Sequence, residues 1–208
     1  AKQEHFKEKY GPWALVTGAA MGLGAEFARQ LAAKGLNLVL VDIKKELVWD
    51  LANQLTQKYG IRTMDLHVDL SDPQFMDRIR QVVKDLEIGL LVSNAGISAV
   101  GWFLDTPLEA HLRELYINAR APLLLTYEFG RQMLARGHGG IILLASLSAS
   151  QGTALVANYA ATKAYNWVLA ESLWDELREK GVDVLAFPPG STDTPGFREE
   201  KPQVTPLV

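Results

Sequence analysis

Short runs of apolar residues alternate along the chain with longer stretches in which apolar side chains recur every three or four positions. The short runs are typical of strands buried on both faces, and the longer stretches have the period of amphipathic helices. Strands are predicted near Trp13–Thr17, Asn37–Val41, Arg62–His67, Ile88–Val92, Gly140–Ala145 and Val182–Phe187. Helices are predicted near Leu23–Lys34, Lys45–Tyr59, Pro73–Leu86, Pro107–Arg136 and Val156–Lys180. This alternation predicts an α/β fold, in which an open, mostly parallel, doubly wound sheet carries helices on both faces.

Two predicted helices begin with capping-box chemistry and have proline early in the first turn. The pairs are Ser71 with Gln74 and Thr106 with Glu109. The longest predicted helix also contains Pro122, which lacks an amide donor and clashes with the carbonyl four residues back. We therefore expect a kink near Asn118.

Composition narrows the classes of function. The shares of hydrophobic and charged residues, 48% and 22%, are ordinary for a globular protein, and we expect a single domain spanning residues 1–208. A net charge of −3 provides no basic field for a phosphate backbone, which argues against nucleic-acid binding. The chain has no cysteine and its 4 histidines lack ligand spacing, so we expect no metal site. No apolar run approaches the roughly 18 residues that span a bilayer, and residues 1–10 lack the apolar core of a secretory signal, so we expect a cytoplasmic location and no membrane partner.

A glycine-rich loop, TGAAMGLG at Thr17–Gly24, follows the first predicted strand and opens the first helix. Its glycines let the backbone turn tightly and approach a bound group, while the helix N-terminus offers free amides to a pyrophosphate. The spacing differs from the P-loop and no GK[ST] follows, which argues against an NTPase. The alternative is a tight connection that binds no ligand.

Asp42 lies at the end of the second strand, where a carboxylate can accept hydrogen bonds from the adenosine ribose hydroxyls. Its negative charge would repel a 2'-phosphate, so NAD is predicted as the cofactor rather than NADP. Lys44 and Lys45 are close enough to keep NADP as an alternative. The other interpretation of Asp42 is a polar residue that simply ends a strand.

Tyr159 and Lys163 are four residues apart, a spacing that places both side chains on one face of a helix. The spacing alone proves little, because Tyr116 with Arg120 and Tyr127 with Arg131 share it and are predicted to be surface pairs. What distinguishes Tyr159 is Ser146, thirteen residues earlier and directly after a predicted strand.

Several short motifs run through the chain in order. They are TGAAMGLG at Thr17–Gly24, HVDLSD with Asp69, SNAGI with Asn94–Gly96, YINAR with Asn118, LLASLSAS with Ser146, YAATK with Tyr159 and Lys163, and PPGSTDT with Pro189, Gly190 and Thr194. On these motifs the chain resembles the short-chain dehydrogenase/reductase family over nearly its whole length. The family has N-x-x-G where this chain has Ala121 in place of the glycine, a departure that bears on local packing.

The resemblance implies a Rossmann-like sheet with strand order 3-2-1-4-5-6 and a catalytic group of Asn118, Ser146, Tyr159 and Lys163. It implies cofactor contacts from Gly18, Met21, Gly22, Leu23, Gly24, Asp42, Asp69, Leu70, Asn94, Ala95, Gly96, Tyr159, Lys163, Pro189, Gly190, Thr192 and Thr194. It also implies that Lys163 holds the nicotinamide ribose, that Asn118 positions a water in a proton relay, and that the protein is a homodimer or homotetramer packed through the two long helices.

The chemistry of the Tyr–Lys pair can be argued from the side chains. A free phenol has a pKa of about 10 and needs nearby positive charge to act as a base near neutral pH. Lys163 supplies that charge, so Tyr159 can move a proton to or from the oxygen of a ketone or secondary alcohol during hydride transfer. Ser146 would hydrogen-bond the same oxygen. Ser148 and Ser150 are neighbours of Ser146, and Asn118 could instead satisfy the carbonyl freed by the kink.

The substrate is less well defined. Trp102, Phe103, Leu147, Leu155 and Val156 could line an apolar pocket, which favours a hydrophobic ketone or secondary alcohol, or could serve packing alone. Family members usually continue for several tens of residues beyond the equivalent of Thr194, so we expect the C-terminal substrate segment to be incomplete and the usual final strand to be missing. Two alternatives are an NAD-binding regulatory or scaffold protein without turnover and a small-molecule binding module that uses no coenzyme.

Overall fold

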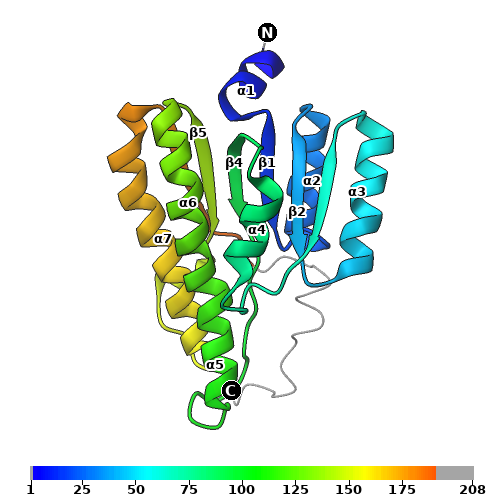
Figure 1. The fold of residues 1–208 in the computed structure, drawn as a ribbon. Helices are drawn as coiled ribbons and strands as arrows, with labels where there is room; N and C mark the ends of the chain where they lie inside the picture. Colours follow the sequence, from blue (N-terminus) through cyan, green and yellow to red (C-terminus); the bar gives the residue numbers. More distant parts are fainter. Residues whose placement is uncertain (1, 191–208) are drawn as a thin grey trace.

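The computed structural model describes residues 2–190, whose strands form a parallel six-stranded sheet (Figure 1). The strands are β1 Trp13–Thr17, β2 Asn37–Asp42, β3 Thr63–His67, β4 Ile88–Ser93, β5 Gly139–Leu144 and β6 Val182–Phe187. The α-helices are α1 Lys2–Tyr10, α2 Gly22–Ala33, α3 Lys45–Tyr59, α4 Phe75–Val83, α5 Leu108–Leu115, α6 Ala121–Arg136 and α7 Ala157–Leu177. The strand order is β3-β2-β1-β4-β5-β6, which confirms the predicted doubly wound sheet and its order.

The two faces of the sheet are covered by different helices. Alternate residues of β1 point to opposite faces, so that Leu15 packs with Phe75 of α4 and Leu125 of α6. Val16 packs on the other face with Leu51 of α3. Figure 1 shows α4, α6 and α7 on one side of the sheet and α2 and α3 on the other. Strand residues buried on both faces explain the continuous apolar runs of the sequence.

The strand order reverses between β1 and β4, which lie side by side although β2 and β3 separate them in sequence. In an open parallel sheet, the crevice outside the carboxyl ends at such a reversal is the usual ligand site. Here the Thr17 hydroxyl at the end of β1 accepts hydrogen bonds from the amides of Asn94 and Ala95, both at 3.1 Å. This link fixes the two loops that leave the reversal point.

The predicted capping boxes do not form. The Ser71 hydroxyl donates to Asp69 instead, and α4 begins at Phe75 without a side-chain cap. The Thr106 hydroxyl donates to the carbonyl of Trp102, and α5 begins at Leu108. In both places a nearby acceptor outside the helix captures the hydroxyl, which is the usual competition for short polar side chains.

The long helix is interrupted where a kink was expected. A π-helical turn, Tyr116–Arg120, separates α5 from α6, and the amide of Ala121 donates to the carbonyl of Tyr116. Asn118 lies in this turn and is fully buried. A π turn contains one more residue than an α turn, which commonly accompanies functional sites.

Helix α1 was not predicted from the sequence. It lies at the amino ends of the strands (Figure 1), where Phe6 and Tyr10 pack against the core under α2 and α3. The Tyr10 hydroxyl donates to the carboxylate of Asp183 in β6, which also pairs with Lys9. The first helix is thereby tied to the last strand that the structure describes.

Among residues 2–190, no helix combines the length and apolar character that crossing a membrane requires.

Candidate active site

A cleft of about 760 Å³ runs along the carboxyl ends of the central strands. Its lining includes the following sequence-predicted residues: Gly18, Met21, Gly22, Leu23, Asp42, Asp69, Leu70, Asn94, Ala95, Gly96, Ser146, Tyr159, Lys163, Pro189 and Gly190. Segments far apart in sequence therefore meet in one site. Thr192 and Thr194 lie outside the described residues. Over the described part of the chain, no three histidine, aspartate or glutamate side chains come together in a way that could hold a metal ion.

The glycine loop forms one end of the cleft, and its conformation requires glycine. Gly18 has a φ of +63°, and a Cβ added to Gly24 would lie 1.9 Å from the carbonyl oxygen of Gly18. The Asn94 amide donates to the carbonyls of Thr17 and Gly18, at 3.0 and 3.1 Å. These two hydrogen bonds from Asn94 fix the start of the glycine loop. Because α2 begins at Gly22 with no side-chain cap, its first amides stay available for a phosphate.

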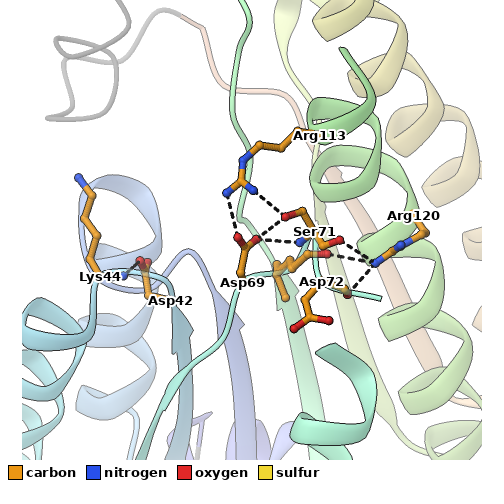
Figure 2. A network of polar contacts seen from close by, with 8 residues as sticks. Asp42, Lys44, Asp69, Ser71, Asp72, Arg113 and Arg120 are labelled. Carbon is orange, nitrogen blue, oxygen red and sulfur yellow. Dashed lines mark hydrogen bonds and ion pairs between the residues drawn. The ribbon is translucent and has the colours of Figure 1, made fainter. Parts of the chain in front are cut away.

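Asp42 lies at the end of β2 and at the edge of the cleft. Its carboxylate oxygens accept from the amides of Ala20 and Lys44, both at 2.9 Å, and Figure 2 shows the bond from Lys44. These bonds fix the carboxylate beside the glycine loop. The Lys44 side chain extends away from Asp42, and its Nζ lies 3.7 Å from the sulfur of Met21.

Asp69 is the centre of a polar network at the end of the strand β3 (Figure 2). Its Oδ1 accepts from the Ser71 amide and hydroxyl at 2.9 and 2.7 Å, and its Oδ2 accepts from Arg113 at 3.0 Å. Partial burial works to raise the pKa of Asp69, but the bonds from Ser71 and Arg113 outweigh it and hold the pKa below the ordinary value. The carboxylate is therefore ionised in the cleft at neutral pH.

Arg113 and Arg120 were not predicted as parts of this network. Arg113 donates to Asp69 and Ser71 from α5, while Arg120 donates to the carbonyl of Asp72 at 2.8 Å. The predicted pair of Tyr116 and Arg120 forms, with the guanidinium 4.9 Å from the Tyr116 ring centre, but Arg120 is half-buried and its guanidinium also lies 5.6 Å from the centre of the buried Phe75 ring. The second predicted surface pair, Tyr127 with Arg131, is exposed as expected.

Ser146, Tyr159 and Lys163 form the other end of the cleft. Ser146 follows β5, and its hydroxyl oxygen lies 2.8 Å from that of Ser148. Lys163 is buried in α7, where its Nζ donates to the Leu144 carbonyl at 3.0 Å and lies 5.7 Å from the Tyr159 ring centre. The neighbouring Ser148 lines the same cleft, whereas Ser150 bonds the Leu147 carbonyl.

The Asn118 side chain faces the loop that follows β4. Its Oδ1 accepts from the amide of Ile97 at 2.9 Å, and its Nδ2 donates to the carbonyl of the same residue at 2.8 Å. The alternative in which this side chain caps the carbonyl freed by the kink is not what the structure has. Asn118 instead fixes the loop of Gly96, where an added Cβ would lie 3.0 Å from the Lys163 ammonium.

Glu114 is a buried carboxylate beside the site that sequence reasoning missed. Its Oε1 accepts from the Ala99 amide at 2.9 Å, and its Oε2 accepts from the Asn158 side chain. Burial raises the pKa of Glu114, although the bonds from Ala99 and Asn158 oppose the shift. Glu114 therefore links the loop after β4 to the start of α7, where its partner Asn158 directly precedes Tyr159.

Part of the predicted apolar pocket belongs to the cleft. Leu147 and Val156 line it, together with Ile97 and Val100. Trp102 and Phe103 lie outside the lining formed by the described residues and expose about half of their surfaces, 57% and 52%. The apolar wall beside Tyr159 is therefore contributed mainly by the loops after β4 and β5.

The geometry agrees with comparisons to known proteins. The family described as short chain dehydrogenase matches residues 12–205. The chain therefore belongs to the short chain dehydrogenase family, a class of NAD(P)-dependent oxidoreductases that interconvert secondary alcohols and ketones by hydride transfer.

Two groups of relatives are similar to the chain. A 7beta-hydroxysteroid dehydrogenase of Clostridium sardiniense is 31% identical over 198 residues, which are 95% of this chain and 76% of the relative. A very-long-chain 3-oxoacyl-CoA reductase of Pyricularia oryzae is 37% identical over 183 residues, 85% of this chain but only 55% of the relative. The chain thus spans about three quarters of the first relative and about half of the second.

Solved structures share the fold and differ in their cofactor. A 7beta-hydroxysteroid dehydrogenase structure has a TM-score of 0.90 and 29% identity, covering 95% of this chain and 76% of its own. A short-chain dehydrogenase from Sphingobium yanoikuyae in complex with NADPH has a TM-score of 0.84 and 30% identity, with 88% and 72% covered. An NAD⁺-bound xylitol dehydrogenase has a TM-score of 0.79 and 27% identity, with 88% and 72% covered.

Proposed function

We propose that this protein transfers hydride between NAD and an apolar ketone or secondary alcohol, with Tyr159 as the acid/base. The observation that carries the proposal is that one cleft joins the glycine loop to Ser146, Tyr159 and Lys163. A protein that bound only a nucleotide would not need the Ser146, Tyr159 and Lys163 end of the cleft, and one that bound only an apolar molecule would not need the glycine loop. A bound nicotinamide supplies the hydride acceptor or donor.

In this proposal the chain's own residues have the following roles. Tyr159 gives its proton to the substrate oxygen in reduction and takes it back in oxidation. Lys163, held by the Leu144 carbonyl, stabilises the phenolate that forms and binds the nicotinamide ribose. The Ser146 hydroxyl donates to the substrate oxygen as charge develops on it, and Ser148 orients that hydroxyl. Asn118 keeps the loop at Gly96 in place and serves the proton relay.

Residues of the cleft fit a dinucleotide. The loop from Gly18 to Gly24 leaves no room for side chains where a pyrophosphate would approach, and the free amides of α2 face it. Asp42 accepts from the adenosine ribose, Asp69 from the adenine amino group, and Pro189 and Gly190 close the nicotinamide end. The fixed negative charge of Asp42 supports NAD over NADP, because it would repel a 2'-phosphate.

The substrate is proposed to be a bulky apolar carbonyl compound. Ile97, Val100, Leu147 and Val156 give the cleft an apolar wall next to Tyr159. Both similar groups of relatives are named for substrates with a large apolar part, the ring system of a hydroxysteroid and the acyl chain of a very-long-chain 3-oxoacyl-CoA. A flat or extended hydrocarbon body packed on this wall would bring its carbonyl to the tyrosine hydroxyl.

Replacement of the tyrosine tests the proposal. Tyr159→Phe removes one oxygen and should lower kcat about 1000-fold with ketone substrates, because the general acid is lost, while binding of NAD measured by calorimetry stays within about threefold. The measurement follows the absorbance of reduced nicotinamide with a panel of steroid and long-chain ketones. Tyr165→Phe, on the same helix, is the matched control and should keep the wild-type rate. Wild-type rates in Tyr159→Phe would overturn the assignment, and NAD binding without turnover of any ketone would leave a regulatory nucleotide-binding protein.

We also propose that the protein is a homodimer packed through α6 and α7. Their outer faces expose apolar side chains, including Leu123 and Tyr127 on α6 and Tyr165 and Val168 on α7. Several exposed apolar side chains on two long helices are what an interface would use. A homotetramer and a cytoplasmic location stay predictions.

A further inference from the structure

Asn166 lies in α7, three residues after Lys163, and only 1% of its surface is exposed. Its Nδ2 donates to the main-chain carbonyl of Asn118 at 2.9 Å and, more weakly, to that of Leu144 at 3.4 Å. The second carbonyl is the one that accepts from the Lys163 ammonium. The buried Asn166 amide therefore contacts two backbone carbonyls next to the proposed catalytic residues, that of Asn118 itself and that of Leu144, which Lys163 also contacts.

The carbonyl of Asn118 needs such a donor because of a proline. In an α-helix it would accept from the amide of residue 122, and Pro122 has no amide hydrogen. The Asn166 side chain replaces the missing donor from the neighbouring helix. A buried carbonyl without a partner would be destabilising, so this bond holds the π turn in its observed form.

The oxygen of the Asn166 amide indicates that this residue does more than fill space in the core. Its Oδ1 is buried and has no hydrogen-bond partner among the described residues. Rotating the amide by 180° would turn that oxygen toward two carbonyl oxygens, so the assignment of Nδ2 and Oδ1 is fixed by the acceptors. The unpaired oxygen carries a desolvation cost that a residue kept only for packing would not carry. Departures from local packing rules are expected at functional sites, and this unpaired oxygen lies beside the proposed proton-transfer group.

We propose that Asn166 is a positioning residue for proton transfer. It fixes the π turn, and hence the Asn118 side chain against Ile97, and it shares the Leu144 carbonyl with Lys163. Its action on the reaction passes through Lys163 and Asn118, without contact with the substrate. The inference rests on the proposed function, in which these two residues serve Tyr159.

The test compares Asn166→Leu with the wild-type protein. Leucine has the same branched shape, is larger and has no donor, so kcat for ketone reduction should fall about 10- to 100-fold, as expected for misplaced catalytic groups. The solvent deuterium isotope effect on kcat should rise because proton transfer becomes slower. The matched control is Thr126→Val, which alters a buried side chain in α6 whose hydroxyl also lacks a partner among the described residues. It should leave kcat and the isotope effect unchanged.

A wild-type kcat in Asn166→Leu, or an equal loss of kcat in Thr126→Val, would overturn the proposal. If the leucine variant does not fold, Asn166→Ser, whose hydroxyl is polar but too short to reach both carbonyls, should fold and also raise the isotope effect, and an unchanged effect counts against the role. A crystal structure of Asn166→Leu decides the matter without turnover: we expect the Asn118 carbonyl and the Lys163 ammonium to move, and unmoved groups would overturn the inference. Absence of turnover in the wild-type protein would instead contradict the proposed function alone.

Discussion

At the scale of single residues, Asp42 is a fixed negative charge at the edge of the cleft, held by the amides of Ala20 and Lys44. Asp42→Asn keeps the shape and one acceptor and removes the charge. We expect the ratio of dissociation constants for NADP and NAD to fall about tenfold or more, because repulsion of the 2'-phosphate by a unit charge is lost. Calorimetric titration with both cofactors measures the ratio.

The control for this prediction is Asp50→Asn, which removes an exposed carboxylate from α3 and should leave the ratio unchanged. An unchanged ratio in Asp42→Asn would show that another residue discriminates between the cofactors, and Lys44 would then be the first to examine.

Glu114 predicts a pH dependence of stability. Since burial raises its pKa in the folded protein, the native state binds more protons than the unfolded state between the ordinary value of 4.5 and the raised one. The stability that the protonated Glu114 contributes is fully present below this pH window and is lost as the pH rises through it. The loss is about 1.4 kcal/mol for each pKa unit by which the folded-state pKa exceeds the unfolded-state pKa. Glu114→Gln cannot titrate, so its free energy of unfolding relative to wild type should rise from pH 4 to pH 7 in urea titrations.

Glu109→Gln, on the exposed side of the same helix, is the control and should track the wild type at every pH. If the wild type and Glu114→Gln kept a constant difference over this range, the raised pKa of Glu114 would be contradicted.

Site residues divide into those that a local motif carries and those that only the fold brings near. Several predicted residues stand in short segments with recognisable spacing and line one cleft, namely Gly18, Gly22, Asp42, Ser146, Tyr159 and Lys163. Gly24 belongs to the same loop but does not line the cleft. Arg113 meets Asp69 across 44 positions, and Glu114 meets Asn158 across a similar distance. Buried charge in a helix of period 3.6 was a usable signal for Glu114, but its partner could not be inferred without the topology.

At the scale of elements, the six strands and the main helices were predicted because buried parallel strands leave a clear apolar pattern. Helix α1 has no such pattern, since Phe6 and Tyr10, which pack against the core, are the only large apolar residues in its sequence. The capping boxes failed for the opposite reason. Their residue pattern was present, but Asp69 and the Trp102 carbonyl offered the hydroxyls other acceptors.

The tie between α1 and β6 can be tested by Asp183→Asn. The carboxylate accepts from Tyr10 and Lys9, and its side chain is 46% exposed, so we expect a loss of about 1 kcal/mol in the free energy of unfolding. Hydrogen exchange in α1 should quicken while the central strands stay protected. Asp175→Asn, which breaks an exposed pair with Arg178 in the last turns of α7, is the control and should change stability by less than about 0.5 kcal/mol. Unchanged exchange in α1 would mean that packing alone holds the helix.

At the scale of the whole molecule, the proposed dimer face can be tested with one charge. Val168 on α7 exposes 62% of its surface, and Val168→Asp should convert a dimer into a monomer in sedimentation velocity, because an unpaired charge cannot be buried cheaply. Leu47→Asp, an equally apolar-to-charged change on α3, should leave the assembly intact. A monomeric wild type at micromolar concentration would contradict the dimer.

The π turn at Tyr116–Arg120 also constrains how the sequence can change. Each residue of an α-helix turns the chain by about 100°, so the extra residue sets the angular phase of all of α6 relative to α5. Deleting one residue here would remove the π turn and would rotate one half against the other by that amount. The side chains of α5 that meet the nucleotide half of the cleft, or those of α6 that fill the core, would then point in the wrong direction. Loss of the extra residue would therefore be disfavoured by the requirements of both helices at once.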